Sequence, residues 1–193
     1  MRCVLLKKEY NRAHAVTYAQ TWALGRNPLF TDFTGGGGNC TNFVSQCILA
    51  GCCEMNYTPT YGWYYLSSAC RAPAWTGVVP FYDFMTGKEE FRQENGGVGP
   101  YATDVPQGAV VPGDVIQLGN EEGQYYHTLF VSDVIGARIL VCAHSNDALN
   151  RDLSTYRYTM LRCLHIEGIR VEAAEDYCFE RLLAGERPPE EPR

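Results

Sequence analysis

Apolar side chains recur every three or four residues in two stretches of the N-terminal half. This spacing places them on one face of an α-helix. The first stretch predicts a helix over Lys8–Gly25, with the glycine as its end. The second predicts a helix that starts at Cys40 and stops at Gly51. Its apolar members are Cys40, Phe43, Val44, Cys47 and Ile48. We expect both apolar faces to pack on a common core.

The C-terminal half differs in character. Its apolar runs are rich in β-branched and aromatic residues and are separated by turn residues, which is typical of antiparallel strands. The four runs are Val115–Leu118, Tyr125–Val134, Ile139–His144 and Tyr158–Ile166. Together they predict a small antiparallel sheet. A closing helix is predicted from the spacing of Val171, Ala174, Cys178 and Leu182.

The segments between these elements are less regular. Cys52–Trp75 is rich in aromatic residues. We place it beside a cleft, although packing of its rings onto the core is an equal alternative. Val79–Lys88 is predicted to be a short helix, and Glu89–Gln107, rich in Gly, Glu and Pro, to be a surface excursion. The polar residues 186–193 predict a disordered tail, which leaves one domain over residues 1–185.

Composition narrows the classes of function. The chain of 193 residues carries a net charge of -6, which argues against a nucleic-acid partner, because such a partner requires a basic face. No apolar run approaches the ~20 residues needed to cross a bilayer, and the apolar stretch near Met1 is too short for a signal peptide. We therefore expect a cytoplasmic location for the chain as given, or a secreted or cell-wall-associated one if a leader has been removed. None of the nine cysteines forms a CxxC pair, so we expect no zinc site and no cofactor.

The loop before the second helix contains four consecutive glycines, Gly35 to Gly38, which allow backbone angles with φ > 0. Asn39 is a favoured N-cap, whose side chain can accept a hydrogen bond from the first turn. Cys40 therefore takes the first helical position, where the helix dipole and unpaired N–H groups favour the thiolate. A cysteine chosen at random is more often a buried apolar residue, and Cys47 is interpreted in that way. For Cys40, the loop, the cap and the helix start together predict a nucleophile.

A thiolate nucleophile needs a base that takes up a proton and returns it to the leaving amine. The chain has four histidines. His14 falls in the first helix and is interpreted as a surface or packed residue, whereas His165 falls in the last strand and is interpreted as a satisfied core histidine. His127 stands at the start of a strand, on the face shared with Leu129 and Val131, and we predict that it is the base.

A third residue must orient the base, and the next strand offers candidates at its end. A two-residue loop in this hairpin would place His144 opposite His127. A four-residue loop, which pairs Val134 with Ile139, would place Asn146 there instead. We favour His144.

Several motifs resemble the bacterial putative amidase domain family. They are GGGGNCTNFVSQC, the upstream YAQTWALGRNP, a midchain Trp75 followed by FYDF, then PGDVIQL, the histidine-led strand and AHSND. That family is itself similar to the NlpC-type branch of papain-like cysteine hydrolases. The resemblance implies an α+β papain-like fold, in which the helix that carries the nucleophile packs on a small antiparallel sheet.

The resemblance also implies roles for single residues. Cys40 becomes the nucleophile, His127 the base and His144 the polar third member. NlpC-type relatives commonly place a tyrosine upstream of the cysteine to help bind the oxyanion, whereas Phe30 and Phe33 here have no hydroxyl group. We therefore expect the backbone N–H of Cys40 to bind the oxyanion, with Asn39 as the second donor.

The sequence thus predicts a cysteine-dependent amide-bond hydrolase that works through a thioester. The resemblance implies peptides of the bacterial cell wall as substrates. Because no export signal is visible, an intracellular amide or peptide is the alternative substrate. The rival function is a binding module on the same fold, whose cleft holds a ligand without turnover.

Overall fold

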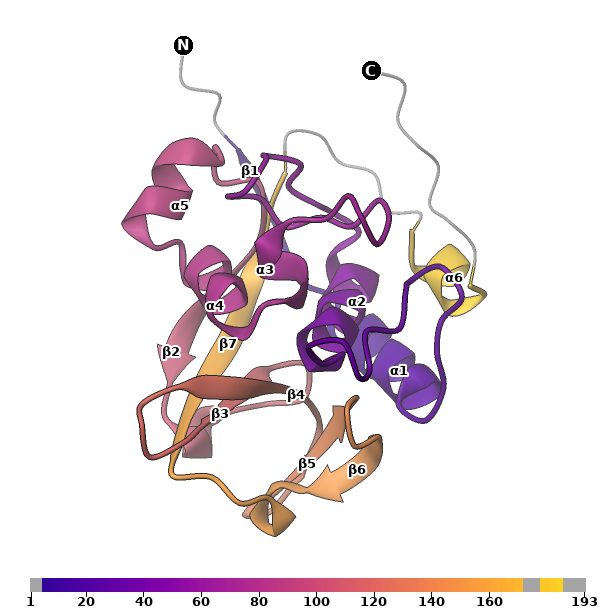
Figure 1. Ribbon diagram of the computed structural model, residues 1–193, viewed down its shortest axis with the longest axis vertical. Coiled ribbons are helices and arrows are strands. Elements are labelled where there is room, and N and C mark those ends of the chain that lie inside the picture. Colours follow the sequence, from indigo (N-terminus) through magenta and orange to yellow (C-terminus); the bar gives the residue numbers. More distant parts are fainter. Residues whose placement is uncertain (1–4, 172–177, 186–193) are drawn as a thin grey trace.

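An antiparallel sheet and the helices packed against it form the structure, a computed structural model that describes residues 5–171 and 178–185 (Figure 1). Within these residues the sheet has seven strands, in the order β1-β7-β3-β4-β5-β6, and β2 pairs with β7. The strands are β1 Leu6–Lys8, β2 Gly99–Val105, β3 Val115–Gly119, β4 Tyr125–Ile135, β5 Arg138–Ala143, β6 Ala148–Asp152 and β7 Met160–Val171. The predicted α+β class with an antiparallel sheet is therefore confirmed.

The sheet is larger than the sequence predicts. The four predicted runs correspond to β3, β4, β5 and β7, whereas β1, β2 and β6 were not expected. The prediction of a surface excursion over Glu89–Gln107 is wrong, because β2 lies within it and pairs with β7 along seven residue pairs, from Gly99 to Val105. The strand GPYATDV has little apolar alternation of its own, so its pairing depends on the long partner strand.

The helices are α1 Arg12–Trp22, α2 Cys40–Cys52, α3 Pro73–Thr76, α4 Val78–Thr86, α5 Glu89–Glu94 and α6 Cys178–Leu183. Two short 3₁₀ turns cover Gln107–Ala109 and Leu153–Thr155. Among the helices of the described residues, none is long and apolar enough to cross a membrane.

Helix α1 begins four residues later than predicted, at Arg12 rather than Lys8. The side chain of Asn11 accepts a hydrogen bond from the backbone N–H of His14 at 3.0 Å and so caps the helix. Lys8 belongs instead to β1, where it pairs with Ile169 of β7.

The prediction that helix α2 stops at Gly51 is wrong, because the helix continues to Cys52. Cys53 then ends it in the left-handed conformation, at φ 53°, and its N–H bonds the carbonyl of Leu49. Gly51 serves close packing instead, because a Cβ added there would lie 2.3 Å from the ring of Tyr10.

The predicted closing helix is only partly correct. Val171 is the last residue of β7, and α6 begins at Cys178. Ala174 and the predicted tail, residues 186–193, lie outside the described residues.

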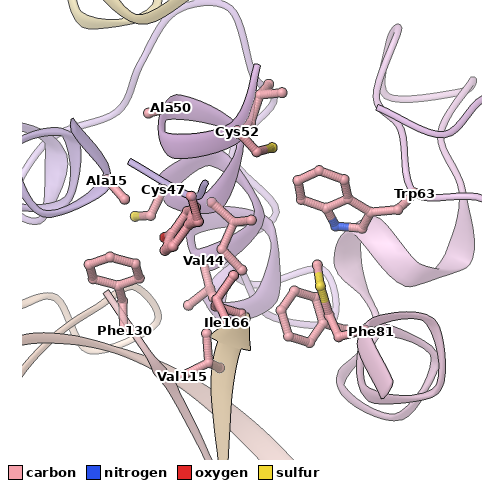
Figure 2. Packing of buried hydrophobic residues seen from close by; sticks show 14 of the residues in the cluster. Ala15, Val44, Cys47, Ala50, Cys52, Trp63, Phe81, Val115, Phe130 and Ile166 are labelled. Carbon is pink, nitrogen blue, oxygen red and sulfur yellow. The ribbon is translucent and has the colours of Figure 1, made fainter. Parts of the chain in front are cut away.

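Helix α2 is buried along its whole length and forms the centre of the core. Figure 2 shows Trp63 and Phe81 on one side of it and Phe130 on the other, with Val115 and Ile166 reaching it from the sheet. The opposite face of the sheet carries a second apolar cluster, which includes Ile116, Leu118, Leu129, Val131 and Val141. Both faces of the sheet therefore bury apolar side chains, and the start of α2 lies against β4.

Candidate functional site

Cys40 follows the glycine loop and lies at the start of α2, as predicted. Gly35, Gly37 and Gly38 adopt φ of 85°, 116° and 97°, a region that other residues rarely enter. Cys40 is the first helical residue and its side chain is buried, with 6% exposed. Within the described residues its thiol has one hydrogen-bond partner, Thr41 Oγ1, at 3.8 Å.

Asn39 occupies the N-cap position, but its side chain makes no capping hydrogen bond, so that part of the prediction is wrong. Its Oδ1 instead accepts hydrogen bonds from the backbone N–H of Phe33 at 3.1 Å and from Asn42 Nδ2 at 2.7 Å. Its Nδ2 lies 2.8 Å from His144 Nδ1. A backbone N–H can only donate, so Phe33 fixes Oδ1 as the acceptor and Nδ2 as the donor.

His144 is held as a neutral imidazole. Its Nδ1 accepts the hydrogen bond from Asn39, and its Nε2 lies 2.9 Å from the carbonyl oxygen of Trp22. Because that oxygen can only accept, Nε2 carries the proton and Nδ1 does not. Burial lowers the pKa of His144, which favours the same neutral form. The ring also stacks on Phe43, with the centroids 4.0 Å apart. Both nitrogens of His144 are therefore occupied.

Near its turn the β4–β5 hairpin has the register of the alternative prediction, although with a shorter loop, because Ile135 also pairs with Arg138. Val134 pairs with Ile139, and the register then shifts at a bulge, so that Phe130 pairs with Cys142. The bulge adds one residue to β4, which moves every earlier residue of that strand by one position relative to β5. Apolar alternation gives no sign of this shift.

The preferred prediction, that His144 lies opposite His127, is therefore wrong. Strand β5 ends at Ala143, before it reaches the level of His127. The next residues form a turn, in which Ser145 and Asn146 adopt φ of 63° and 99°. Neither His144 nor Asn146 forms a hydrogen bond with His127 in the described part of the chain.

His127 lies on the sheet face of Leu129, as predicted, because residues two apart in a strand share a face. Helix α2 packs on the other face, where Thr41 Oγ1 and Thr128 Oγ1 lie 2.8 Å apart. Cys40 and His127 are thus each adjacent in sequence to one partner of this buried hydrogen bond. No hydrogen bond joins the two residues directly within the described residues.

An open pocket of about 510 Å3 lies beside His127. Its wall includes the rings of Tyr126 and Tyr156 and the cationic side chains of Arg151 and Arg157. Burial, together with the charge of Arg151, lowers the pKa of His127 from 6.5 to about 4. His127 is therefore an unprotonated imidazole at neutral pH and can accept a proton.

Ser145 joins this pocket to the nucleophile loop. It lines the pocket, and its Oγ accepts a hydrogen bond from the backbone N–H of Asn39 at 2.6 Å. Asp147 of the same turn forms an ion pair at 2.9 Å with Arg26, which lies in the loop after α1. One residue of the pocket wall is therefore hydrogen-bonded to the residue that precedes Cys40, whereas Asn39 and Cys40 are not among the residues that line the pocket.

Sequence reasoning missed Ser145 and Asn42 as site residues. Trp75 Nε1 donates to Asn42 Oδ1 at 2.8 Å, which leaves Asn42 Nδ2 to donate to Asn39. The signal for Asn42 is the repeated asparagine in NCTN, and the signal for Ser145 is a run of turn residues after a strand. The full burial of Trp63 and Trp75 supports the core-packing alternative for Cys52–Trp75.

The remaining histidines have packing roles, in agreement with the prediction. The ring of His14 stacks on Phe179 with the centroids 3.5 Å apart. His165 Nδ1 lies 3.0 Å from Asp114 Oδ2, and Arg12 contacts Asp114 Oδ1 at 2.7 Å. The Asp114 side chain is fully buried, so this network ties α1 to the sheet.

The described residues contain no group of three or more His, Cys, Asp and Glu side chains that could hold a metal ion. Six cysteines in this part of the chain form no disulfide, and Cys70 is the exposed one among them. Cys53 is disulfide-bonded.

Comparison with known proteins identifies the class. Residues 9–166 match the family described as "Putative amidase domain", so the chain belongs to this family, as the resemblance predicted. The description of this family refers to hydrolysis of an amide bond. The chain is also 31% identical over 126 residues to the "Uncharacterized protein YhbB" of Bacillus subtilis (strain 168). The matched stretch covers 64% of this chain and 37% of the length of that protein. No solved structure matches.

Proposed function

We propose that this member of the amidase family is a cysteine-dependent amide hydrolase, with Cys40 as the nucleophile and His127 as the base. The observation that carries the proposal is the hydrogen bond between Ser145 Oγ and the backbone N–H of Asn39, at 2.6 Å. It connects the loop that presents Cys40 to the pocket that His127 lines. The proposal requires that a substrate seated in that pocket also reaches the thiol of Cys40, which does not itself line the pocket.

The proposed reaction has two halves. His127 removes the proton from the Cys40 thiol, and the sulfur attacks the carbonyl carbon of the amide. His127 then gives the proton to the leaving amine, and a thioester remains. In the second half, water attacks the thioester with His127 again as the base, and the acyl product leaves as a carboxylic acid.

The negative charge that develops on the carbonyl oxygen needs donors. The backbone N–H of Cys40 is at the first helical position, where no carbonyl of the helix itself can accept from it. Asn39 Nδ2 donates one of its two hydrogens to His144 and keeps the second. We assign the oxyanion to these two groups.

His144 is proposed as a positioning residue and not as the partner of His127. It acts on Asn39, which in turn sets the backbone at Cys40. Catalytic hydrogen bonds are often long before substrate binds, so the separation of Cys40 and His127 is compatible with their roles.

The helix-borne cysteine and the strand-borne histidine support an NlpC-type, papain-like mechanism. Cell-wall peptides are the substrates that this mechanism suggests, and an intracellular amide is the alternative. One observation favours the rival function, a ligand-binding module: no direct hydrogen bond joins Cys40 and His127 within the described residues.

Alkylation with iodoacetamide distinguishes the two functions. The reaction is run near pH 6, about two units below the pKa of an ordinary thiol, and the modified cysteine is mapped by mass spectrometry. The hydrolase requires Cys40 to react faster than Cys70, although Cys70 is more exposed. Labelling of Cys70 alone would favour the binding module.

A further inference from the structure

The pocket beside His127 has an excess of positive charge. Two arginines, Arg151 and Arg157, line it, and among the described residues no acidic side chain does. This local excess contrasts with the net charge of the whole chain, which is -6. A cationic concave surface on an acidic protein concentrates anions locally.

The Arg157 side chain is free to bind a ligand. Its guanidinium forms no hydrogen bond or ion pair within the part of the chain that the structure describes. Its backbone is nevertheless fixed, because the carbonyl oxygen of Arg157 accepts a hydrogen bond from the hydroxyl of Tyr126 at 3.0 Å. The residue therefore presents a planar cation from an anchored position on the pocket wall.

Arg151 is held in place by its neighbours. Its Nε donates to Thr155 Oγ1 at 2.7 Å, and its guanidinium lies 4.2 Å from the centroid of the Tyr156 ring. These contacts order the side chain before a ligand arrives, which reduces the entropy lost on binding.

We propose that this pocket is a subsite for a carboxylate group of the amide substrate, with Arg157 as its principal ligand and Arg151 as the second cation. A guanidinium fork matches the geometry of a carboxylate. The rings of Tyr126 and Tyr156 supply apolar walls for the carbon chain that carries it. The subsite rests on the proposed function, since it defines which amides reach Cys40.

A carboxylate bound in this subsite would change the basicity of His127. The groups that surround His127 in the pocket and can carry charge are Arg151, Arg157, Tyr126 and Tyr156. Burial lowers the pKa of His127 most and the positive charge of Arg151 lowers it further, and a bound carboxylate would offset the second of these causes. An acidic substrate would thus make His127 a stronger base at the moment when it is needed.

The test compares two probes of equal size, N-acetyl-glutamate N-methylamide and its glutamine counterpart. They differ by one negative charge. Binding to the full chain is measured by NMR titration, in wild type and in the variants Arg157→Gln and Arg138→Gln. Arg138 is the matched control, because it pairs with Asp152 at 2.7 Å and does not line the pocket. Both variants change the net charge equally. Arg151→Lys, which keeps the charge and loses the fork, is a third variant.

The account predicts that the acidic probe binds wild type at least tenfold more tightly than the neutral probe. Arg157→Gln should remove this preference, Arg151→Lys should reduce it, and Arg138→Gln should preserve it. Binding of the acidic probe should also raise the pKa of His127, measured from its ring proton shift. Equal binding of the two probes, no binding of either, or equal losses in Arg157→Gln and Arg138→Gln would overturn the proposal. Tighter binding of inorganic phosphate than of the acidic probe would overturn the carboxylate assignment.

The outcome is separable from that of the proposed hydrolysis. The probes are titrated into the Cys40→Ala variant as well, where turnover by the thiol is absent. If a protein that still hydrolyses amides shows no preference for the acidic probe, the subsite proposal is wrong and the hydrolase proposal stands. If the preference for the acidic probe is present but hydrolysis does not depend on Cys40, the proposed mechanism is wrong and the subsite proposal stands.

Discussion

Asn39 Nδ2 donates a hydrogen bond to His144 Nδ1, at 2.8 Å, across 105 residues of sequence. The direction of this bond is determined at both ends. The backbone N–H of Phe33 fixes the amide of Asn39, and the carbonyl of Trp22 fixes the proton on His144 Nε2. The residue before the proposed nucleophile is thereby held in one orientation by a histidine that stays neutral.

His144→Ala should destabilise the protein by about 1–3 kcal/mol, because it leaves Asn39 Nδ2 without its partner in a buried region and removes the ring that stacks on Phe43. It should also lower kcat but leave a residual rate, since His144 acts through Asn39. The measurements are urea denaturation and steady-state hydrolysis. A double-mutant cycle with Asn39→Ala provides the control, because two residues that share one hydrogen bond have non-additive effects. Additive losses would contradict the coupling.

His127→Ala should abolish hydrolysis and also slow the alkylation of Cys40 near neutral pH, because the thiolate loses the base that forms it. His14→Ala is the matched control, since His14 lies in α1 and stacks on Phe179. The rates of alkylation of Cys40 are compared in the two variants. If the rate is unchanged in His127→Ala, another group activates the thiol.

Stability should fall as the pH is lowered from about 6.5 to 4. The folded-state pKa of His127 is about 4, below its ordinary value of 6.5, and burial also lowers that of His144. Between these values the unfolded chain binds more protons than the native state, so the free energy of unfolding rises with pH. The contribution is fully present above the unfolded-state pKa and is lost as the pH falls through the folded-state pKa. Each histidine adds at most ~1.4 kcal/mol per pH unit.

The measurement is the urea midpoint as a function of pH, in wild type and in His127→Gln. The variant should show a shallower decline between about pH 6.5 and 4, because one of the two histidines has been removed. Identical slopes for the two proteins would show that His127 is not shielded from protonation.

Gly51→Ala should cost about 1–3 kcal/mol, because the new methyl group would lie 2.3 Å from the ring of Tyr10 in a closely packed region. Gly36→Ala is the control, since its nearest atom would be Phe33 O at an ordinary 3.7 Å. Chemical denaturation of both variants checks the difference. Equal stabilities would mean that the Tyr10 ring can move away from α2 without cost.

The elements that depend on local signals could be predicted from the sequence. Cys40 starts α2 because glycines, a polar residue and an apolar helical face follow one another in the chain. The histidine-bearing strand and its face were predicted from alternation, and His127 lies where expected. The family was recognised from the motifs around these same residues.

The predictions that are wrong concern features that depend largely on contacts between segments far apart in the sequence. The Asn39 side chain makes no capping bond to the helix backbone because Phe33, Asn42 and His144 offer it other partners, and His144 is brought there by the sheet. The register of the β4–β5 hairpin depends on one bulged residue, which periodicity does not detect. Strand β2 forms because β7 offers it an edge. His144 and β7 are far in the sequence from the segments that they contact.

The central claim is that Cys40 carries the acyl group during hydrolysis. The direct test is to quench a reaction with an N-acyl amide in acid after a few turnovers and to map the covalent adduct by mass spectrometry. The account predicts the acyl mass on Cys40, its absence from Cys70, and neither adduct nor turnover in a folded Cys40→Ala variant. Hydrolysis that persists in Cys40→Ala, or an acyl group found on a different residue, would contradict it.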